Sequence, residues 1–271
     1  MPENYKPKIT IITPSYNQGK YIRTTIDSIS AQQYQNFEHI VVDGGSTDDT
    51  LDILKSCSHI KWLSEKDKGQ SDALSKGLKL ATGDIIGWIN SDDYYDQGVF
   101  NRVAEAFNDP TVNWVVSNIT YQFDLNGSLI TNKTQKITYD SLLANADLVR
   151  QQGAFYRKEF LISAGGWDPQ YYMVMDYDLW VRLARRSAPL MVDENWAFFR
   201  FHADQKTSLK NILRQEQEIL GILKRENANY ISRFKVRLVK RKQWIKGLIK
   251  EQLIKYKLLD KKYASLPIRE K

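Results

Sequence analysis

The feature that most constrains the fold of this 271-residue chain is an alternation of two patterns through its first half. Short β-branched or apolar runs, which predict strands, occur at Lys8–Thr13, Glu38–Asp43, Ile60–Leu63, Asp84–Ile89 and Trp114–Tyr121. Between them, apolar residues recur at helical spacing in Tyr21–Ala31, from about Asp49, in Gly69–Ala81 and in Gly98–Phe107. This alternation predicts an α/β fold: a mostly parallel sheet with helices on both faces.

Local signals define the ends of some of these elements. Pro14 is predicted to end the first strand, because proline has no N–H to donate to a neighbouring strand. Ser46 or Thr47 is predicted to cap the helix that starts near Asp49, since hydroxyl side chains accept hydrogen bonds from the first turn of a helix.

Polar clusters follow three of the predicted strands, at Thr13–Asn17, Asp43–Asp48 and Asn90–Asp93. The carboxyl ends of parallel strands meet at one edge of a sheet, and ligands of such sheets bind there. We therefore expect these clusters to form one site.

The two strongest clusters suit a nucleotide and a cation. Asp92 and Asp93 are adjacent carboxylates after a strand, a pattern suited to Mg²⁺ or Mn²⁺ that takes its other ligands from phosphates and water. Gly44 and Gly45 allow close backbone approach to a ligand, and Asp43 can accept hydrogen bonds from a base or a ribose. The plainer alternatives are a solvated Asp-Asp turn and a Gly-Gly turn.

Two further clusters lie in the second half of the chain. Asp176 and Asp178 stand near a helix start, where the helix dipole favours ionised carboxylates, and either could be a general base or have no catalytic duty. Arg200 and His202, followed by Gln205, Lys206 and Ser208, could hold a diphosphate or a metal. Lys66 and Lys68 are further candidates for phosphate contact.

The charge distribution and the cysteine content limit the cellular compartment and the kinds of site that this chain can have. Residues 209–271 carry 18 Lys and Arg against 6 Asp and Glu, a net charge of +12, whereas residues 1–208 carry −5. Cys57 is the only cysteine, which excludes an intramolecular disulfide and a cysteine zinc site and fits the cytoplasm. No apolar stretch of about 18 residues is present, so no membrane span is expected.

The basic tail carries a second pattern. Residues 231–259 place one set of apolar side chains near a single helix face, with Lys and Arg around the rest: Ile231, Phe234, Leu238, Ile245, Leu248, Ile249, Tyr256 and Leu259. This arrangement favours a helix lying on an anionic membrane surface. The alternatives are a helical hairpin packed on the domain and a dimerisation helix.

Taken together, these motifs resemble the family 2 glycosyltransferases over residues 8–208. The resemblance is carried by Ile11–Asn17, Val42–Asp48, Ala81–Asp84 leading into Ser91-Asp92-Asp93, and Gly165–Asp168 followed by Met175–Trp180. It implies a GT-A fold over residues 1–208, with a nucleotide-sugar half (1–124), an acceptor half (125–208) and a basic helical extension (209–271). It also implies Mn²⁺ or Mg²⁺, inversion at the anomeric carbon, and surface-polysaccharide synthesis on a glycan or lipid-linked acceptor.

The resemblance also assigns roles to residues. Asp176 would be the base, with Asp178 as second choice because Met175 stands where the family often has Glu. Asp93 and His202 would hold the metal. Asp92 would touch the ribose of the donor, and Asp43 would touch its nucleobase. Lys68 stands where the family often has Arg. Because members of this family often use UDP-sugars, the resemblance implies a UDP-sugar as the donor. The expected donor-binding residues are Thr13, Pro14, Tyr16, Asn17, Asp43, Ser46, Lys68, Ser91 and Asp92.

Two other functions compete with this interpretation. A sugar-phosphate nucleotidyltransferase would carry a Gly-rich phosphate loop with Arg or Lys near its N-terminus, whereas Thr13–Gly19 has one Gly and no Arg. A nucleic-acid-binding protein would explain the basic tail but not the acidic clusters, because carboxylates repel phosphate. We therefore expect no nucleic-acid partner.

Overall fold

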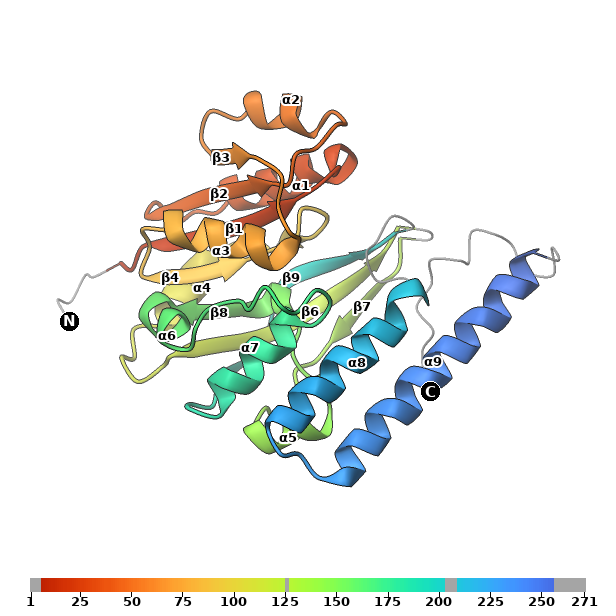
Figure 1. Ribbon diagram of the computed structural model, residues 1–271. Helices are drawn as coiled ribbons and strands as arrows, with labels where there is room; N and C mark the ends of the chain where they lie inside the picture. Colours follow the sequence, from red (N-terminus) through yellow and green to blue (C-terminus); the bar gives the residue numbers. More distant parts are fainter. Residues whose placement is uncertain (1–5, 125–126, 203–208, 256–271) are drawn as a thin grey trace.

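The structure is a computed structural model, which describes residues 6–124, 127–202 and 209–255 (Figure 1). Within these ranges the chain forms one nine-stranded sheet in the order β3-β2-β1-β4-β8-β6-β9-β5, with β7 paired to β6. The strands are β1 (Ile9–Ser15), β2 (Phe37–Asp43), β3 (Lys61–Ser64), β4 (Ile85–Trp88), β5 (Tyr94–Tyr95), β6 (Trp114–Phe123), β7 (Leu129–Asn132), β8 (Ala154–Arg157) and β9 (Leu190–Phe201). The helices are α1 (Gly19–Ser30), α2 (Thr50–Lys55), α3 (Gln70–Leu80), α4 (Val99–Ala106), α5 (Tyr139–Ala144), η1 (Gln151–Gly153), α6 (Lys158–Ser163), α7 (Met175–Ala184), α8 (Leu209–Arg225) and α9 (Tyr230–Lys255).

The sheet confirms the predicted α/β class. β3, β2, β1 and β4 are parallel to one another, whereas β8 runs antiparallel to both β4 and β6. β6 and β9 are parallel, over a register that shifts near Asn118. The sheet is therefore parallel in its first half and mixed in its second.

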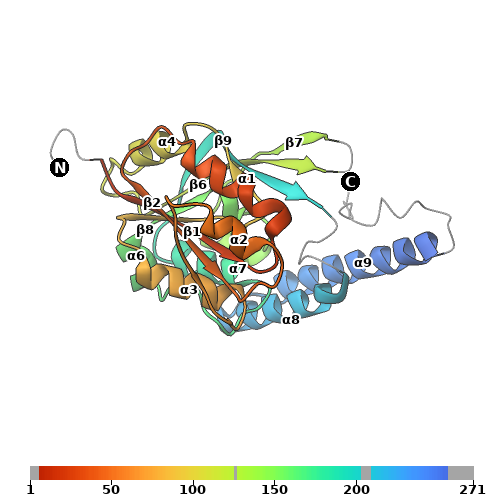
Figure 2. The same ribbon diagram turned by 90° about the horizontal axis from the view of Figure 1, so that it is seen from above.

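Helices cover both faces of the sheet, as predicted (Figure 2). On β1, Ile9 and Ile11 belong to the buried cluster that contains the apolar side of α4, whereas Ile12 belongs to the cluster formed with α3 and α7. Alternate residues of a strand point to opposite faces, so a continuous apolar run such as β1 requires cover on both sides.

β1 continues through Pro14 and ends at Ser15, so the prediction that Pro14 ends the strand is wrong. The carbonyl of Ile12 accepts from Ile89 on the β4 side, and the carbonyl of Ser15 accepts from Gly44 on the β2 side. Because successive residues face opposite neighbours, Pro14 faces the β4 side, where pairing with β1 already ends at Ile12. The missing N–H therefore costs the sheet no hydrogen bond.

The predicted cap of α2 is also wrong. α2 begins at Thr50 and has no side-chain cap. The hydroxyl of Ser46 instead donates to Asp43, and the hydroxyl of Thr50 donates to Asp48 at 2.5 Å. Carboxylates of the loop therefore accept hydrogen bonds from these two hydroxyl groups, and the Ser46 hydroxyl does not cap the helix.

The C-terminal helices α8 and α9 form a hairpin beside α5 and α7 (Figures 1 and 2). Ile219, Ile222 and Leu223 of α8 are buried in the same cluster as the apolar side of α7. None of the helices described here is both long and apolar enough to cross a bilayer. Six residues that carried expectations lie outside the described residues or have no described side chain: Gln205, Lys206, Ser208, Ile249, Tyr256 and Leu259.

Candidate active site

The three predicted polar clusters meet at the carboxyl edge of the parallel strands. The backbone N–H of Asn17, after β1, donates to the hydroxyl of Ser46 at 2.7 Å, and the N–H of Thr47 donates to the side chain of Asn17 at 2.9 Å. The hydroxyl of Thr25 in α1 donates to the carbonyls of Ser91 and Asp93 at 3.0 and 2.6 Å. The loops after β1, β2 and β4 are therefore tied into one rim.

At the end of β1 and in the loop after it, the side chains of Tyr16 and Asn17 reach the surface, whereas those of Thr13 and Pro14, within the strand, do not. Tyr16 is 59% exposed. Asn17 has φ of 52°, a left-handed conformation that asparagine tolerates better than most residues. The hydroxyl of Thr13 is buried 2.9 Å from His39 Nε2, so Thr13 and Pro14 shape the end of the strand.

Asp43 organises the loop after β2 from inside the protein. Its carboxylate is fully buried and accepts hydrogen bonds from the backbone of Gly45 and Ser46 and from the hydroxyl of Ser64. Ser46 adds a hydroxyl donor to the same carboxylate. These bonds fix the backbone of Gly44–Thr47. Because the Asp43 carboxylate is buried, this backbone is the part of the loop that a ligand could contact.

The loop that carries Lys66 and Lys68 lies against this backbone. A Cβ on Gly45 would lie 3.6 Å from Lys66 Cγ. Lys68 is exposed, and its backbone N–H donates to Asp72 in the first turn of α3 at 3.1 Å. The structure thus brings the Glu65–Gly69 loop, which carries two lysines and two carboxylates, beside Gly44 and Gly45, with Asp67 next to Gly44.

Asp92 and Asp93 point in different directions. Asp93 is 1% exposed, and its carboxylate accepts hydrogen bonds from Gln152 at 2.7 Å, Asn90 at 3.2 Å and the backbone of Arg200 at 3.0 Å. Burial, followed by the negative charge of Asp92, raises the pKa of Asp93 well above its usual value, and the hydrogen bonds oppose this shift. The Asp92 side chain keeps 18% of its surface exposed.

His202 meets Asp92, not Asp93. Its Nε2 lies 3.0 Å from Asp92 Oδ2. His202 follows β9, and its ring packs on Tyr21 of α1 with 4.1 Å between ring centroids. The guanidinium of Arg200, two residues earlier, lies over the rings of Tyr21 and Tyr94.

The Asp92–His202 pair fits a divalent cation that is completed by its substrate. A carboxylate oxygen and an imidazole nitrogen are both ligands for Mn²⁺. The described part of the chain has no group of three or more His, Cys, Asp or Glu side chains that could hold a metal. Such a cation would therefore need phosphate oxygens and water for its remaining ligands, as Mg²⁺ sites on nucleotides do.

Asp176 and Asp178, in the first turn of α7, have unlike surroundings. Asp178 is fully buried and pairs with Arg182 at 2.7 Å and with Arg225 of α8 at 2.5 Å. Asp176 is half-buried, and its Oδ1 accepts from the backbone of Tyr177 at 2.8 Å. Two arginines thus hold Asp178 in the interior.

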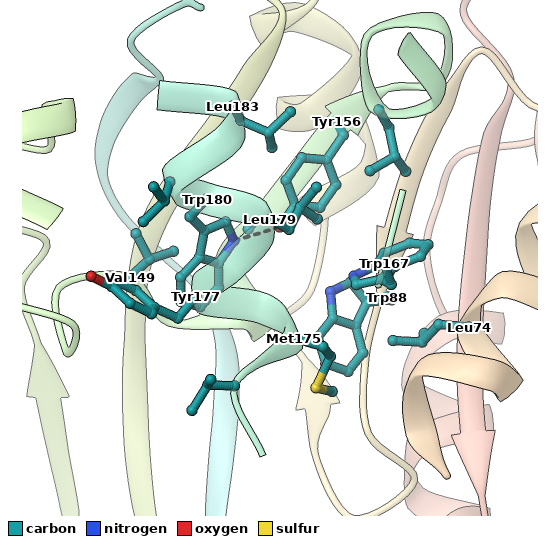
Figure 3. Packing of buried hydrophobic residues seen from close by; sticks show 14 of the residues in the cluster. Leu74, Trp88, Val149, Tyr156, Trp167, Met175, Tyr177, Leu179, Trp180 and Leu183 are labelled. Atoms are coloured by element: carbon teal, nitrogen blue, oxygen red, sulfur yellow. Dashed lines mark hydrogen bonds between the residues drawn. The ribbon is translucent and has the colours of Figure 1, made fainter. Parts of the chain in front are cut away.

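The start of α7 lies at the same edge of the sheet as the Asp92–His202 pair. The hydroxyl of Ser71 donates to the carbonyl of Tyr171 at 2.9 Å, and Gln70 donates to Asn90 at 2.5 Å. α3 therefore links the segment before α7 to the loop that carries Asp92. Figure 3 shows Met175 beside Trp88, the last residue of β4, within one buried cluster.

Several residues of this edge were not predicted from the sequence, above all Gln152 and Thr25, which hold the Asp92–Asp93 loop. Gln152 lies in η1, just before β8, and reaches Asp93 because β8 is inserted between β4 and β6. An antiparallel insertion of this kind leaves no periodic signal in a single sequence. Thr25 lies on a helix face whose other buried residues are mostly apolar, which concealed its role.

This architecture defines the class of protein: a glycosyltransferase with the GT-A fold. The model of glycosyl transferase family 2 matches residues 10–163, and the chain belongs to that family. The resemblance seen in the sequence motifs is thereby confirmed.

Curated relatives support the same class. The chain is 28% identical over 192 residues to an uncharacterized glycosyltransferase of Mycobacterium tuberculosis, covering 69% of this chain and 72% of the relative. It is 25% identical over 215 residues to the chondroitin synthase of Escherichia coli, covering 78% of this chain and 31% of the synthase. It is 35% identical over 108 residues to the putative teichuronic acid biosynthesis glycosyltransferase TuaG of Bacillus subtilis, covering 38% of this chain and 42% of TuaG.

Solved structures share the fold at lower identity. S. aureus TarS 1–349 in complex with UDP-GlcNAc matches with a TM-score of 0.63 and 18% identity, over 79% of this chain and 66% of that one. The mannosyltransferase PcManGT of Pyrobaculum calidifontis, in complex with GDP-Man and Mn²⁺, matches with a TM-score of 0.60 and 20% identity, over 81% and 64%.

Proposed function

We propose that this glycosyltransferase moves a hexose or N-acetylhexosamine from a UDP-sugar to a hydroxyl of a glycan or lipid-linked acceptor in polysaccharide biosynthesis, with inversion. The observation that carries the proposal is the Asp92–His202 pair at 3.0 Å on the edge where α7 presents Asp176. A site for a diphosphate-bound cation and a candidate base thus share one edge of the sheet.

The names of relatives and structural neighbours support this choice of donor and process. The TarS neighbour is in complex with UDP-GlcNAc, and the mannosyltransferase neighbour with GDP-Man and Mn²⁺. The chondroitin synthase and TuaG are named for polysaccharide products. The TarS complex supports a UDP-sugar, the mannosyltransferase complex supports a nucleotide-diphosphate sugar with Mn²⁺, and the two relatives support a glycan acceptor.

For the metal, we propose Asp92 with His202, in place of Asp93. The buried Asp93 carboxylate is already bound by three donors, which leaves it the poorer ligand. In this arrangement Asp93 positions the loop. A bound Mn²⁺ or Mg²⁺ would neutralise negative charge on the leaving diphosphate.

Residues of the rim would hold the rest of the donor. Tyr16, which is exposed next to the left-handed Asn17, would stack on the nucleobase. The Gly44–Thr47 backbone, which Asp43 fixes, would contact the nucleoside. Lys68 is exposed in the loop between β3 and α3 that lies against Gly45, and it would contact the diphosphate. Thr13, Pro14, Ser46 and Ser91 would act by shaping these loops.

The chemistry assigned to Asp176 is general-base catalysis. Asp176 takes the proton of the acceptor hydroxyl as its oxygen bonds to the anomeric carbon. The bond from that carbon to the diphosphate oxygen breaks, and its electron pair leaves with the nucleoside diphosphate. A single displacement inverts the configuration. Asp178 is unsuited to this role because two arginines hold it in the interior.

A thermal-shift screen tests the proposed donor. UDP-, GDP- and dTDP-sugars are added to the protein with Mn²⁺ and, separately, with EDTA. A ligand that binds the folded state at 100 times its Kd stabilises it by about 2.7 kcal/mol. We expect UDP-sugars with Mn²⁺ to raise Tm most. Equal Tm values for all three nucleotides, with or without Mn²⁺, would reject the proposal.

We also propose that α9 places the enzyme on an anionic membrane surface. Seven large apolar side chains of α9 are exposed. Val239 lies apart from the other six, which are Tyr230, Ile231, Phe234, Leu238, Ile245 and Leu248. At 100° per residue these six fall within about 100° of arc, opposite the side that carries the buried Ser232 and Val236. Lys235, Lys242 and Lys246 follow one border of this apolar stripe and Arg233 and Arg237 the other.

Vesicle flotation tests the membrane proposal. The full chain is compared with Phe234→Glu/Leu238→Glu, which alters the stripe and leaves the packed side intact. A truncation at 208 is unsuitable, because it removes Ile222 and Leu223 from the core. We expect the wild type to float with vesicles that contain phosphatidylglycerol, less so in high salt, and the variant to remain below. Equal flotation would reject the proposal. Loss of a dimer in the variant, with no wild-type flotation, would assign the stripe to dimerisation.

A further inference from the structure

A carboxylate from the C-terminal hairpin binds the backbone that leads into α7. Glu218 of α8 accepts hydrogen bonds from three consecutive N–H groups: Oε1 from Tyr172 at 3.3 Å, and Oε2 from Met173 at 2.8 Å and Val174 at 3.2 Å. The next residues in the chain are Met175 and Asp176. One side chain thus fixes the backbone segment that lies directly before the candidate base.

This carboxylate lies at the N-terminal end of α7. Of the three N–H groups that it binds, only that of Val174, the N-cap residue, belongs to the helix end, and the other two precede it. The N-cap residue of α7 is Val174, whose side chain makes no cap hydrogen bond. The first N–H groups of a helix lack partners within the helix, and negative charge near them is favourable because of the helix dipole. Glu218 supplies both an acceptor and a charge, from a position 44 to 46 residues along the chain.

Other residues of α8 hold the same region on both sides of Asp176. Arg214 donates to Glu218 at 2.9 Å, and its guanidinium lies over the Tyr172 ring, 4.2 Å from the ring centroid. Arg225 pairs with Asp178, two residues after Asp176. The backbone of the first turn of α7 is therefore held from α8 both before and after the candidate base.

We propose that Glu218 is a positioning residue for catalysis: it holds the start of α7 so that Asp176 meets the acceptor hydroxyl. The proposal rests on Asp176 being the base, as in the proposed function. It makes α8 part of the acceptor side of the enzyme, although α8 follows the segment that resembles family 2. In this role Glu218 acts through the backbone before α7 and needs no contact with either substrate.

Kinetics of three variants of the full chain test this role. Glu218→Ala removes the acceptor atoms, and Glu218→Gln keeps the shape and one oxygen. Glu216→Gln is the matched control, because Glu216 lies on the same helix and pairs with Arg241 of α9 at 3.0 Å. Thermal melts set an assay temperature at which every variant is folded, and kcat and KM are measured for the donor and the acceptor.

We expect Glu218→Ala to lose about 10²-fold in kcat, since small displacements of a catalytic group cost this much, and Glu218→Gln to lose roughly tenfold. KM for the donor should stay near the wild-type value, which a general loss of structure would not allow. Should Glu218→Ala fail to fold, Glu218→Gln decides alone. A kcat of Glu218→Gln equal to that of Glu216→Gln overturns the proposal. A wild type that transfers no sugar refutes the proposed function instead.

Discussion

Replacing Asp178 with asparagine should lower stability, and replacing Asp176 with asparagine should lower turnover, although the two residues stand two positions apart on α7. Asp178 is fully buried between Arg182 and Arg225. Its substitution leaves two guanidinium groups with a weaker partner. Asp176 is half-buried at the edge of the sheet, and its Oδ1 accepts a hydrogen bond from the backbone N–H of Tyr177 at 2.8 Å.

The size of the Asp178 effect follows from how deeply each group is buried. Removing one partner of a buried ion pair costs about 3–5 kcal/mol. The side chains of Arg182 and Arg225 keep 21% and 36% of their surface exposed, so water recovers part of this loss. Asparagine also retains one acceptor oxygen. We therefore expect a loss of about 2–3 kcal/mol, which for a domain of this size lowers Tm by roughly 5–10 °C.

The assay combines thermal melts with transfer kinetics below the lower Tm. Asp178→Asn should melt early and keep measurable turnover. Asp176→Asn should melt within about 0.5 kcal/mol of the wild type and lose about 10²–10⁴-fold in kcat. The opposite pattern, in which Asp178→Asn is stable but inactive and Asp176→Asn is active, would refute the assignment of the two carboxylates.

Three further predictions concern Glu38 of β2, Tyr16 after β1, and Gln152 of η1. Burial alone would raise the pKa of Glu38, but hydrogen bonds from Lys61, Thr82 and Thr10 outweigh it and lower the pKa to about 2. The stabilisation that the lowered pKa gives is present above the ordinary glutamate pKa and is lost as pH falls through 2. Glu38→Gln should therefore lower the free energy of unfolding by about 1–2 kcal/mol at pH 7, after allowance for screening. Urea melts should show the difference between variant and wild type closing between pH 4.5 and 2. A gap independent of pH would contradict this. Tyr16→Ala should weaken UDP binding by about 1–3 kcal/mol in calorimetry, and unchanged binding would remove the stacking role. Gln152→Leu should cost about 1–3 kcal/mol by leaving Asp93 short of a donor, and a melt like that of the wild type would show this bond to be dispensable.

The fold was largely predictable because its parallel half is built from local patterns. β1, β2 and β4 are apolar on both faces, and α1 and α3 show helical spacing, so each element carries its own signal. The meeting of the three polar clusters followed from parallel strand order alone. Pro14 was misjudged because its effect depends on which neighbour the residue faces, and that is a property of the sheet.

The detailed roles within the site could not be predicted, because they depend on contacts between distant segments. Asp92 and Asp93 are identical in type and adjacent, and only Gln152 and the backbone of Arg200 draw Asp93 inward. Asp178 is held by Arg225, which is 47 residues away in the basic C-terminal segment, for which the sequence predicted no part in the site. A sequence shows which carboxylates are near one another in the chain, but not which of them the fold buries.

The most direct test of this account is calorimetry of Mn²⁺ binding in the presence of UDP. We expect the wild type and Asp176→Asn to bind Mn²⁺ and UDP together, and Asp92→Ala and His202→Ala each to lose most of this binding. If Asp92→Ala binds Mn²⁺ as the wild type does, the cation is not held by the Asp92–His202 pair, and the site proposed at this edge of the sheet is wrong.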